Sequence, residues 1–313
     1  MVHVIIFAIS LSICYTERMK TICVTIAKNW EGRTVGELLK TEFAVSRTLL
    51  SKLKRRQDGI LLNDRPVYVT HRVSCGDTLT AAVGDDRRMD IPPRPYPLSI
   101  RYEDPDYLVL SKPCGMAVHP TRDPDELTLE HALLAYLPES ENPHPISRLD
   151  KGTTGLMLVA KSGYAHTQMK KQMERGLVQK EYLAIASGCP SPSEGSIHLP
   201  IAPLPGSTYQ RTVSPDGQKS SSHYRVLATR GELSLLHLIP ETGRTHQLRV
   251  HLSHIGHPLL GDWLYGTRHP QYPHALLHAY RLRFVHPFTD ECITLEAPLP
   301  DAMRTLFPDA PLP

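Results

Sequence analysis

The stretch ISRLDKGTTGLMLVAKS, residues 146–162, decides the fold and raises the first functional question. Its second half, residues 155–160, alternates apolar and small side chains, which indicates a strand of a sheet. Its first half places Arg148 and Asp150 one residue apart, directly before a Lys-Gly-Thr-Thr turn. On spacing alone the structural interpretation is favoured, in which Asp150 caps the turn through the amides of Gly152 and Thr153.

The composition describes an ordinary globular protein. The chain has 313 residues, of which 41% are hydrophobic and 21% charged, and this length accommodates two domains or one large domain with an appendage. Aromatic residues make up only 6%, and 28 prolines indicate many connecting loops rather than long helices.

The positive charge is unevenly distributed. Residues 19–84 contain 11 Lys and Arg against 6 Asp and Glu, a local net charge of +5, whereas the whole chain carries only +3. This asymmetry is typical of an attached nucleic-acid-binding domain, although a solvated basic face would look the same.

Cysteines and histidines show no ligand spacing. The six cysteines lie far apart, and the 17 histidines are mostly dispersed. Neither a metal site nor a disulfide framework is therefore expected, and scattered single thiols fit a reducing cytosol.

The first 18 residues do not fit the pattern that follows. Residues 2–15 are as apolar as a signal-peptide core, but no Lys or Arg precedes them, and they are too short to span a bilayer comfortably. Met19 then opens a proper strand. We expect residues 1–18 to be an upstream extension, consistent with a misassigned start; a genuine export signal is the alternative.

Residues 19–84 predict a small helix-rich domain. After an opening strand, helices are expected at residues 34–43 and 46–56, the second capped by Ser46. A hairpin is expected around Asn63 and Asp64. Four basic residues crowd the end of the second helix: Lys52, Lys54, Arg55 and Arg56. The helix dipole favours cations there, so part of this cluster has a structural explanation. The unit resembles the alpha-L RNA-binding domain typified by a ribosomal small-subunit protein.

Residues 85–97 are charged and then proline-rich, which is typical of a semi-extended linker. Residues 98–313 form the second expected domain. Helices are expected at residues 165–174 and 245–255. Strands are expected at residues 98–104, 107–112, 155–161, 181–187, 222–229, 233–240, 277–285 and 292–298. Because strands outnumber helices and do not alternate with them, we expect an α+β fold with a mixed, largely antiparallel sheet.

Three further stretches stand beside the opening one. Residues 112–120, KPCGMAVHP, follow a strand with a Gly/Pro loop, and residues 179–188 place Tyr182 at the start of another strand. Residues 241–266 contain a dense polar segment. Its members are Arg244, His246, Gln247, Arg249 and His251.

Together these motifs resemble the RluA-type pseudouridine synthase family, which modifies ribosomal RNA and some transfer RNA. The family's Arg-Leu-Asp motif falls on residues 148–150, and its Gly-Arg-Thr-His-Gln-Leu-Arg-Val-His motif on residues 243–251. Lys-Pro-X-Gly, Gly-His-Pro-Leu-Leu-Gly-Asp and Leu-His-Ala are met at residues 112–115, 256–262 and 277–279. Ser147 and Thr154 stand where the family usually has His and Ser.

The resemblance implies roles for these residues. Asp150 would act as nucleophile or base, Arg249 would be its cationic partner with Arg244 as the runner-up, and no cofactor or metal would be needed. Tyr182 would stack on the uracil, and its alternative is an ordinary strand aromatic. Arg148 would fill the gap left by a flipped base. Contacts to RNA are expected from two further groups: Arg244, Thr245, His246 and Gln247, and the basic cluster Lys52, Lys54, Arg55 and Arg56.

Two other functions compete with this one. A glycoside hydrolase also cleaves a glycosidic bond but usually needs two acidic residues. A non-catalytic RNA-binding protein with a decayed domain is the second alternative. Nucleotide-dependent chemistry is disfavoured, because neither phosphate-loop glycine motif is present. The expected partner is structured RNA, ribosomal RNA first and transfer RNA second, for a cytoplasmic monomer that binds no membrane.

Overall fold

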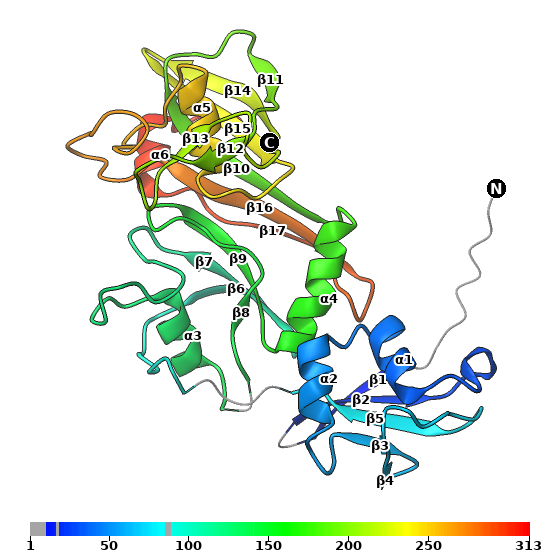
Figure 1. The fold of residues 1–313 in the computed structure, drawn as a ribbon. Coiled ribbons are helices and arrows are strands. Elements are labelled where there is room, and N and C mark those ends of the chain that lie inside the picture. Colours follow the sequence, from blue (N-terminus) through cyan, green and yellow to red (C-terminus); the bar gives the residue numbers. More distant parts are fainter. Residues whose placement is uncertain (1–10, 17–18, 85–88, 140) are drawn as a thin grey trace, which may run out of the picture. The chain divides into compact units, whose positions relative to one another are not determined.

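The computed structural model describes residues 11–16, 19–84, 89–139 and 141–313, and the chain forms two compact units (Figure 1). The first unit comprises Met1–Asp90, Leu137–His144 and Ala160–Lys171. The second comprises Ile91–Tyr136, Pro145–Val159 and Gln172–Pro313. The division into residues 19–84, 85–97 and 98–313 stays a prediction.

The first unit contains a five-stranded sheet with the order β1-β2-β5-β3-β4. Its strands are β1 (Leu11–Thr16), β2 (Met19–Thr25), β3 (Ile60–Leu62), β4 (Arg65–Pro66) and β5 (Thr78–Ala82). Part of the expected N-terminal extension thus pairs with the strand that follows it, because β1 runs antiparallel to β2. Residues 1–10, 17 and 18 lie outside the described residues, and the export signal stays an open alternative.

Two short helices of the first unit begin at side-chain caps. Helix α1 (Val35–Thr41) starts with a capping box, in which Thr34 and Glu37 each accept the other's backbone amide. Helix α2 (Arg47–Leu53) is capped by Ser46, whose Oγ accepts the Leu49 amide at 3.1 Å. A short 3-10 helix, η1 (Lys28–Trp30), precedes them.

The hairpin expected in the first unit is also present. Asn63 and Asp64 both have positive φ, 51° and 62°, as a tight two-residue hairpin turn requires.

The second unit is built on a ten-stranded sheet. Eight strands follow the order β11-β14-β15-β10-β16-β9-β7-β6, while β17 pairs with β16 and β8 with β9. Their bounds are β6 (Ser99–Glu103), β7 (Tyr107–Lys112), β8 (His144–Pro145), β9 (Thr154–Ala160), β10 (Val178–Ser187), β11 (Glu194–Ile197), β14 (Ser222–Arg230), β15 (Leu233–Pro240), β16 (Leu277–Val285) and β17 (Cys292–Glu296). The pairing of β9 with β16 is parallel, whereas β10 runs antiparallel to both β15 and β16. The expected mixed, largely antiparallel α+β fold is confirmed.

The remaining elements include two helices that the sequence did not predict. Both predicted helices are present, as α4 (Gly163–Glu174) and α5 (Gln247–His254). A small sheet pairs β12 (Ile201–Pro203) with β13 (Arg211–Val213). Helix α3 (Leu129–Tyr136) was missed because six consecutive residues from Leu129 are buried, so no polar face alternates with an apolar one. Helix α6 (Asp301–Leu306) is too short to show a period.

Strand β10 has hydrophobic partners on both faces. Tyr182, Ala184 and Ala186 belong to the main core cluster, which also contains Leu149. Ile185, between them in the chain, packs with Met303 in a separate cluster with α6. This alternation makes β10 a strand buried on both faces and places Tyr182 on the same side as Leu149.

Strand β9 depends on a glycine where it meets β16. Gly155 has φ +102°, and a Cβ at this position would lie 2.2 Å from the carbonyl oxygen of Ala279. Beside it, Thr154 Oγ1 and His278 Nδ1 lie 2.8 Å apart. Thr154 therefore supplies a hydroxyl hydrogen bond to the adjacent strand, as the serine usual in the family also can.

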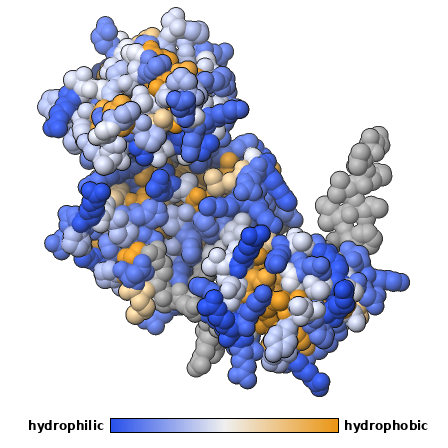
Figure 2. All heavy atoms as spheres, viewed as in Figure 1, coloured by the Kyte–Doolittle hydropathy of each residue, from blue (hydrophilic) through white to orange (hydrophobic). Residues whose placement is uncertain are grey.

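The part of the chain that the structure describes contains no helix long and apolar enough to cross a membrane. On the face shown in Figure 2, hydrophilic side chains predominate and apolar ones form separate patches.

Candidate active site

The turn before β9 is closed by backbone atoms. The Thr153 amide donates to the carbonyl oxygen of Asp150 at 3.0 Å, not to its carboxylate. The turn is also tied to the Gly/Pro loop, because Lys112 Nζ and the Gly115 amide both donate to the carbonyl of Lys151, at 3.1 and 2.9 Å. The turn-capping interpretation of the Asp150 side chain is therefore wrong, and its carboxylate is available for other contacts.

Leu149 determines which way its two neighbours face. It is buried in the core, whereas Arg148 is exposed and the side chain of Asp150 is 27% exposed. Arg148 and Asp150 both line a cavity of about 640 Å³.

Arg249 joins two carboxylates. Its Nη1 donates to Asp150 Oδ2 at 3.0 Å, and its Nε and Nη2 donate to the two oxygens of Asp262 at 2.7 Å each. Burial lowers the pKa of Arg249, but Asp262 and Asp150 outweigh burial, and the net pKa is raised. The forked pair with Asp262 fixes the plane of the guanidinium, so that its remaining edge points at Asp150.

Asp262 is enclosed by the segment that follows it. It is fully buried, and its Oδ1 also accepts the amides of Leu264 and Tyr265, at 3.1 and 3.3 Å. The Tyr265 ring centroid lies 5.1 Å from the Arg249 guanidinium carbon. Asp262 thus holds Arg249 in place and has no exposed surface for a substrate.

His246 completes the surroundings of Asp150. It precedes α5 with φ 57°, a left-handed conformation that is uncommon outside glycine. Its Nδ1 lies 2.7 Å from the Tyr265 hydroxyl, and its Nε2 lies 3.9 Å from Asp150 Oδ1. Burial lowers the pKa of His246, against the attraction of Asp150, which raises it. The ring is therefore mostly neutral at physiological pH.

Tyr182 and Lys180 from β10 also line the cavity. Burial raises the pKa of Tyr182, so its hydroxyl keeps its proton at neutral pH, and burial lowers the pKa of Lys180. The predicted reacting residues Asp150 and Tyr182 therefore line one cavity, although they come from different parts of the chain.

The residues expected to contact RNA divide into three groups. Arg148, Arg244, Thr245 and His246 line the cavity. Gln247 also reaches it, but its side chain is buried and hydrogen-bonded to Ser221 O and Thr242 Oγ1, at 2.8 and 2.7 Å. The basic cluster lies in the first unit, at and beyond the end of α2.

Comparisons with known proteins agree with this arrangement. The profile of the RNA pseudouridylate synthase family matches residues 106–254, and that of the RluD ribosomal pseudouridine synthase N-terminal domain matches residues 22–79. The chain is 35% identical over 270 residues to the uncharacterized RNA pseudouridine synthase YjbO of Bacillus subtilis, covering 85% of this chain and 95% of that protein. The chain belongs to the RluA-type family of RNA pseudouridine synthases.

Other members of the family support the assignment. Ribosomal large subunit pseudouridine synthase D of Haemophilus ducreyi is 38% identical over 261 residues, or 78% of each chain. The solved structure of human RNA pseudouridylate synthase domain containing 1 matches with a TM-score of 0.54 and 28% identity, over 68% of this chain and 88% of that one. The enzyme is an RNA pseudouridine synthase, and its N-terminal match lies inside residues 19–84, where the sequence predicted an RNA-binding domain.

Three residues that shape the site of this pseudouridine synthase had no role in the sequence-based interpretation. Asp262 and Tyr265 hold Arg249, and Lys112 holds the turn after Asp150. Lys112 is buried, and burial lowers its pKa to about 8, but its ammonium still donates to three carbonyl oxygens. Lys112 and Asp262 were visible only as members of a motif.

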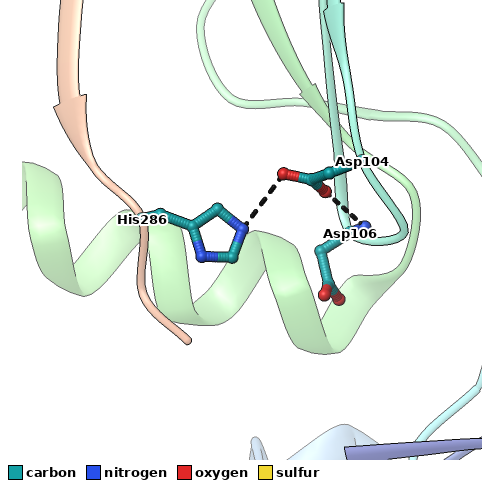
Figure 3. A group of neighbouring side chains, drawn as sticks. All are labelled: Asp104, Asp106 and His286. Carbon is teal, nitrogen blue, oxygen red and sulfur yellow. Dashed lines mark hydrogen bonds and ion pairs between the residues drawn. The ribbon is translucent and has the colours of Figure 1, made fainter. Parts of the chain in front are cut away.

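One group in the described residues has donor atoms close enough to share a metal ion: Asp104, Asp106 and His286 (Figure 3). His286 Nδ1 accepts the amides of Phe288 and Thr289, so Nε2 carries the proton and donates to Asp104 at 3.1 Å. The carboxylate of Asp106 points away from that pair. These hydrogen bonds occupy both nitrogens of the imidazole, and they join the β6–β7 turn to the residues after β16.

Proposed function

We propose that this enzyme converts specific uridines of structured RNA into pseudouridine, in large-subunit ribosomal RNA first and transfer RNA second, with Asp150 as the reacting group. One observation carries the proposal: the Asp150 carboxylate lines the cavity while a buried Asp262 fixes its cationic partner, Arg249. The choice of ribosomal RNA is supported by the named relatives and by the N-terminal match.

The reaction breaks the bond between ribose carbon 1′ and uracil nitrogen 1 and forms a bond from carbon 1′ to carbon 5. Carbon 5 loses its hydrogen as a proton, and nitrogen 1 gains a proton. Atoms and electrons are conserved, so the isomerisation needs no cofactor. Asp150 acts either as a nucleophile or as a base, at the ribose or at the ring, and Arg249 orients its carboxylate through the hydrogen bond of 3.0 Å.

Tyr182 contacts the uracil base, and Arg148 fills the gap that the base leaves in the RNA. The Tyr182 ring stacks on the uracil, and its protonated hydroxyl can exchange a proton with it or donate a hydrogen bond. Arg148 is exposed beside Asp150, where it can enter the stack from which the uridine is flipped.

The remaining polar residues bind and orient the RNA. Arg244 is exposed at the cavity and donates its Nε to the carbonyl of Lys219 at 3.1 Å, which leaves its outer nitrogens for phosphate. Thr245 and His246 line the same cavity. Gln247 acts as a positioning residue, because its amide braces the loop before α5. Lys52, Lys54, Arg55 and Arg56 add phosphate contacts from the first unit.

Hydrolysis of a sugar polymer is the weaker alternative. A glycosidase needs a second carboxylic acid that reaches its substrate, usually more than 5 Å away from the first. The carboxylate joined to Asp150 through Arg249 is Asp262, which has no exposed surface and accepts four hydrogen bonds. It is therefore unsuited to proton transfer at a glycosidic oxygen.

Chemical mapping of pseudouridines tests the proposal. Total RNA from cells lacking the gene should lose one or more pseudouridines in large-subunit ribosomal RNA, and the wild-type gene should restore them. Asp150→Asn should restore none, whereas Asp309→Asn, the same substitution at an exposed position, should restore all. Loss confined to transfer RNA would reverse the order of substrates, and restoration by a folded Asp150→Asn protein would remove Asp150 from its role.

The expected cytosolic location and monomeric state belong to the same proposal. Cell fractionation and sedimentation of the purified enzyme test them.

A further inference from the structure

A second hollow lies next to Asp150, outside the cavity already described. It has a volume of about 380 Å³ and shares Asp150, His246 and Arg249 with the main cavity. Its other wall carries two aromatic side chains, Tyr209 and Trp263, which are 56% and 45% exposed. The main cavity therefore continues past the reacting carboxylate onto an exposed aromatic surface.

Trp263 also begins a third hollow, of about 520 Å³, which runs over Arg268, His269 and Tyr272. The guanidinium carbon of Arg268 lies 5.6 Å from the Trp263 ring centroid. His269 and Tyr272 are stacked, with their ring centroids 4.8 Å apart. The second and third hollows thus share Trp263, and aromatic rings and cationic side chains line both of them.

The two exposed rings stand on fixed backbone. Trp263 directly follows the buried Asp262, and its amide donates to the Gly261 carbonyl at 3.0 Å. The loop of Tyr209 is anchored to the same segment, because the amide of Arg211 donates to the Tyr265 hydroxyl at 2.9 Å and Gln210 Nε2 donates to the Leu264 carbonyl at 3.5 Å. Both rings are therefore anchored to residues 261–265, the segment that also contains the Arg249 partners Asp262 and Tyr265.

Exposed aromatic rings beside cations match the chemistry of unpaired nucleotides. Bases stack on aromatic faces, and guanidinium groups neutralise the phosphates between them. An apolar protein partner would instead be met by aliphatic side chains, whereas Arg268, His269 and His274 accompany the aromatic rings here.

We propose that Trp263, together with Tyr209, is a stacking platform for an unpaired RNA base next to the uridine that enters the main cavity. The inference rests on the proposed function and extends it to the substrate's flanking nucleotides. Extruding a uridine breaks its stacking with its neighbours. A neighbour that stacks on Trp263 recovers part of that loss, and the enzyme would accordingly prefer targets with an unpaired neighbour.

Tryptophan fluorescence gives a direct test, because the chain has two tryptophans, Trp30 and Trp263, and Trp30 is buried. Full-length Asp150→Asn enzyme is titrated with oligouridylate of about eight nucleotides, a typical length for single-stranded sites. A matched abasic ribose-phosphate oligomer is the control. Oligouridylate should quench the emission and the abasic oligomer should not, and the quenching should vanish in Trp263→Phe. Equal quenching by both oligomers, or none by oligouridylate, would overturn the platform.

The affinity for the same oligouridylate distinguishes loss of base stacking from a general structural effect of the substitution. Trp263→Ala should weaken binding about 5- to 150-fold, the range typical for loss of one stacked base, while Trp263→Phe should keep most of the affinity. Tyr136→Ala, at an aromatic residue of similar exposure in α3, is the matched control and should bind like the parent. Unchanged affinity in Trp263→Ala would refute this inference alone. Absence of pseudouridine formation by the wild-type enzyme would instead refute the proposed function.

Discussion

Replacing Arg249 by alanine tests the arrangement that we place at the centre of catalysis. The change removes three charged hydrogen bonds, two of 2.7 Å to Asp262 and one of 3.0 Å to Asp150. Asp262 is then left fully buried with only backbone amides as donors. Removal of one partner from a buried ion pair typically costs about 3–5 kcal/mol, and we expect a loss of this size in the free energy of unfolding.

The effect on catalysis should be a loss of rate rather than of RNA affinity. Without Arg249, the Asp150 carboxylate loses the charged hydrogen bond of 3.0 Å that orients it in the cavity. A small misplacement of a reacting group can lower the rate about 100-fold, and we expect a fall of about this size in the single-turnover rate.

Two variants serve as controls for this loss of rate. Arg249→Lys restores the charge, but one ammonium cannot replace the planar fork, so its rate should be intermediate. Arg244 is exposed and has no contact with Asp150 in the described residues, so Arg244→Ala should weaken RNA binding and leave the rate at saturating enzyme unchanged. The assay measures the single-turnover rate and the Kd on an RNA fragment that contains the mapped uridine. A loss of the saturated rate in Arg244→Ala, with none in Arg249→Ala, would refute our assignment of the two arginines.

Three other predictions address stability and RNA binding. Burial lowers the pKa of His278 to about 4, whereas the same side chain in the unfolded chain titrates near pH 6.5. Below that pH the unfolded state binds a proton that the folded state does not bind. The free energy of unfolding should therefore fall by about 2 kcal/mol between pH 7 and pH 5 through this residue. Urea unfolding should show a smaller fall in His278→Asn. Gly155→Ala should lower the free energy of unfolding by about 3 kcal/mol or more, because its φ is positive and the new Cβ would collide with Ala279. Gly231→Ala should cost about 1 kcal/mol, because its φ is also positive but its Cβ would meet open space. Similar losses in both variants would contradict the steric argument. Substituting Lys54 and Arg55 with Gln should flatten the salt dependence of RNA binding by a slope of about 1 to 2, and an unchanged slope would make the cluster a solvated helix end.

The sequence predicted the sheet well because its strands carry strong local patterns. All eight strands expected after residue 97 are present, with boundaries that differ by a few residues. The elements that it missed after residue 97 lack such a pattern. Strands β11, β12 and β13 have three or four residues each, and α3 is buried along most of its length. Their positions depend on contacts with distant segments, which a local window does not contain.

The site was predicted unevenly for the same reason. Asp150 and Arg249 stood out because each lies in a motif of several polar residues, and the fold brings them within 3.0 Å across 99 positions of sequence. Asp262 ends an apolar motif and resembles a turn residue. Its importance comes entirely from Arg249, which it orients, and that relation exists only in three dimensions. For the turn after Asp150, the sequence suggested that the Asp150 side chain accepts the backbone amides. In the structure the backbone carbonyl oxygen of Asp150 accepts the Thr153 amide instead, and a local sequence pattern does not distinguish these two acceptors.

The charge balance around Asp150 explains why a polyanion can approach it. Asp150, Asp262 and Arg249 together carry one formal negative charge, and the carboxylate of Asp262 is fully buried. The negative charge that faces the cavity is therefore that of one partly neutralised carboxylate. Two exposed arginines, Arg148 and Arg244, line the same cavity. Although the chain outside residues 19–84 has a net charge of −2, the local field at the site favours phosphate, and field rather than net charge governs the encounter with RNA.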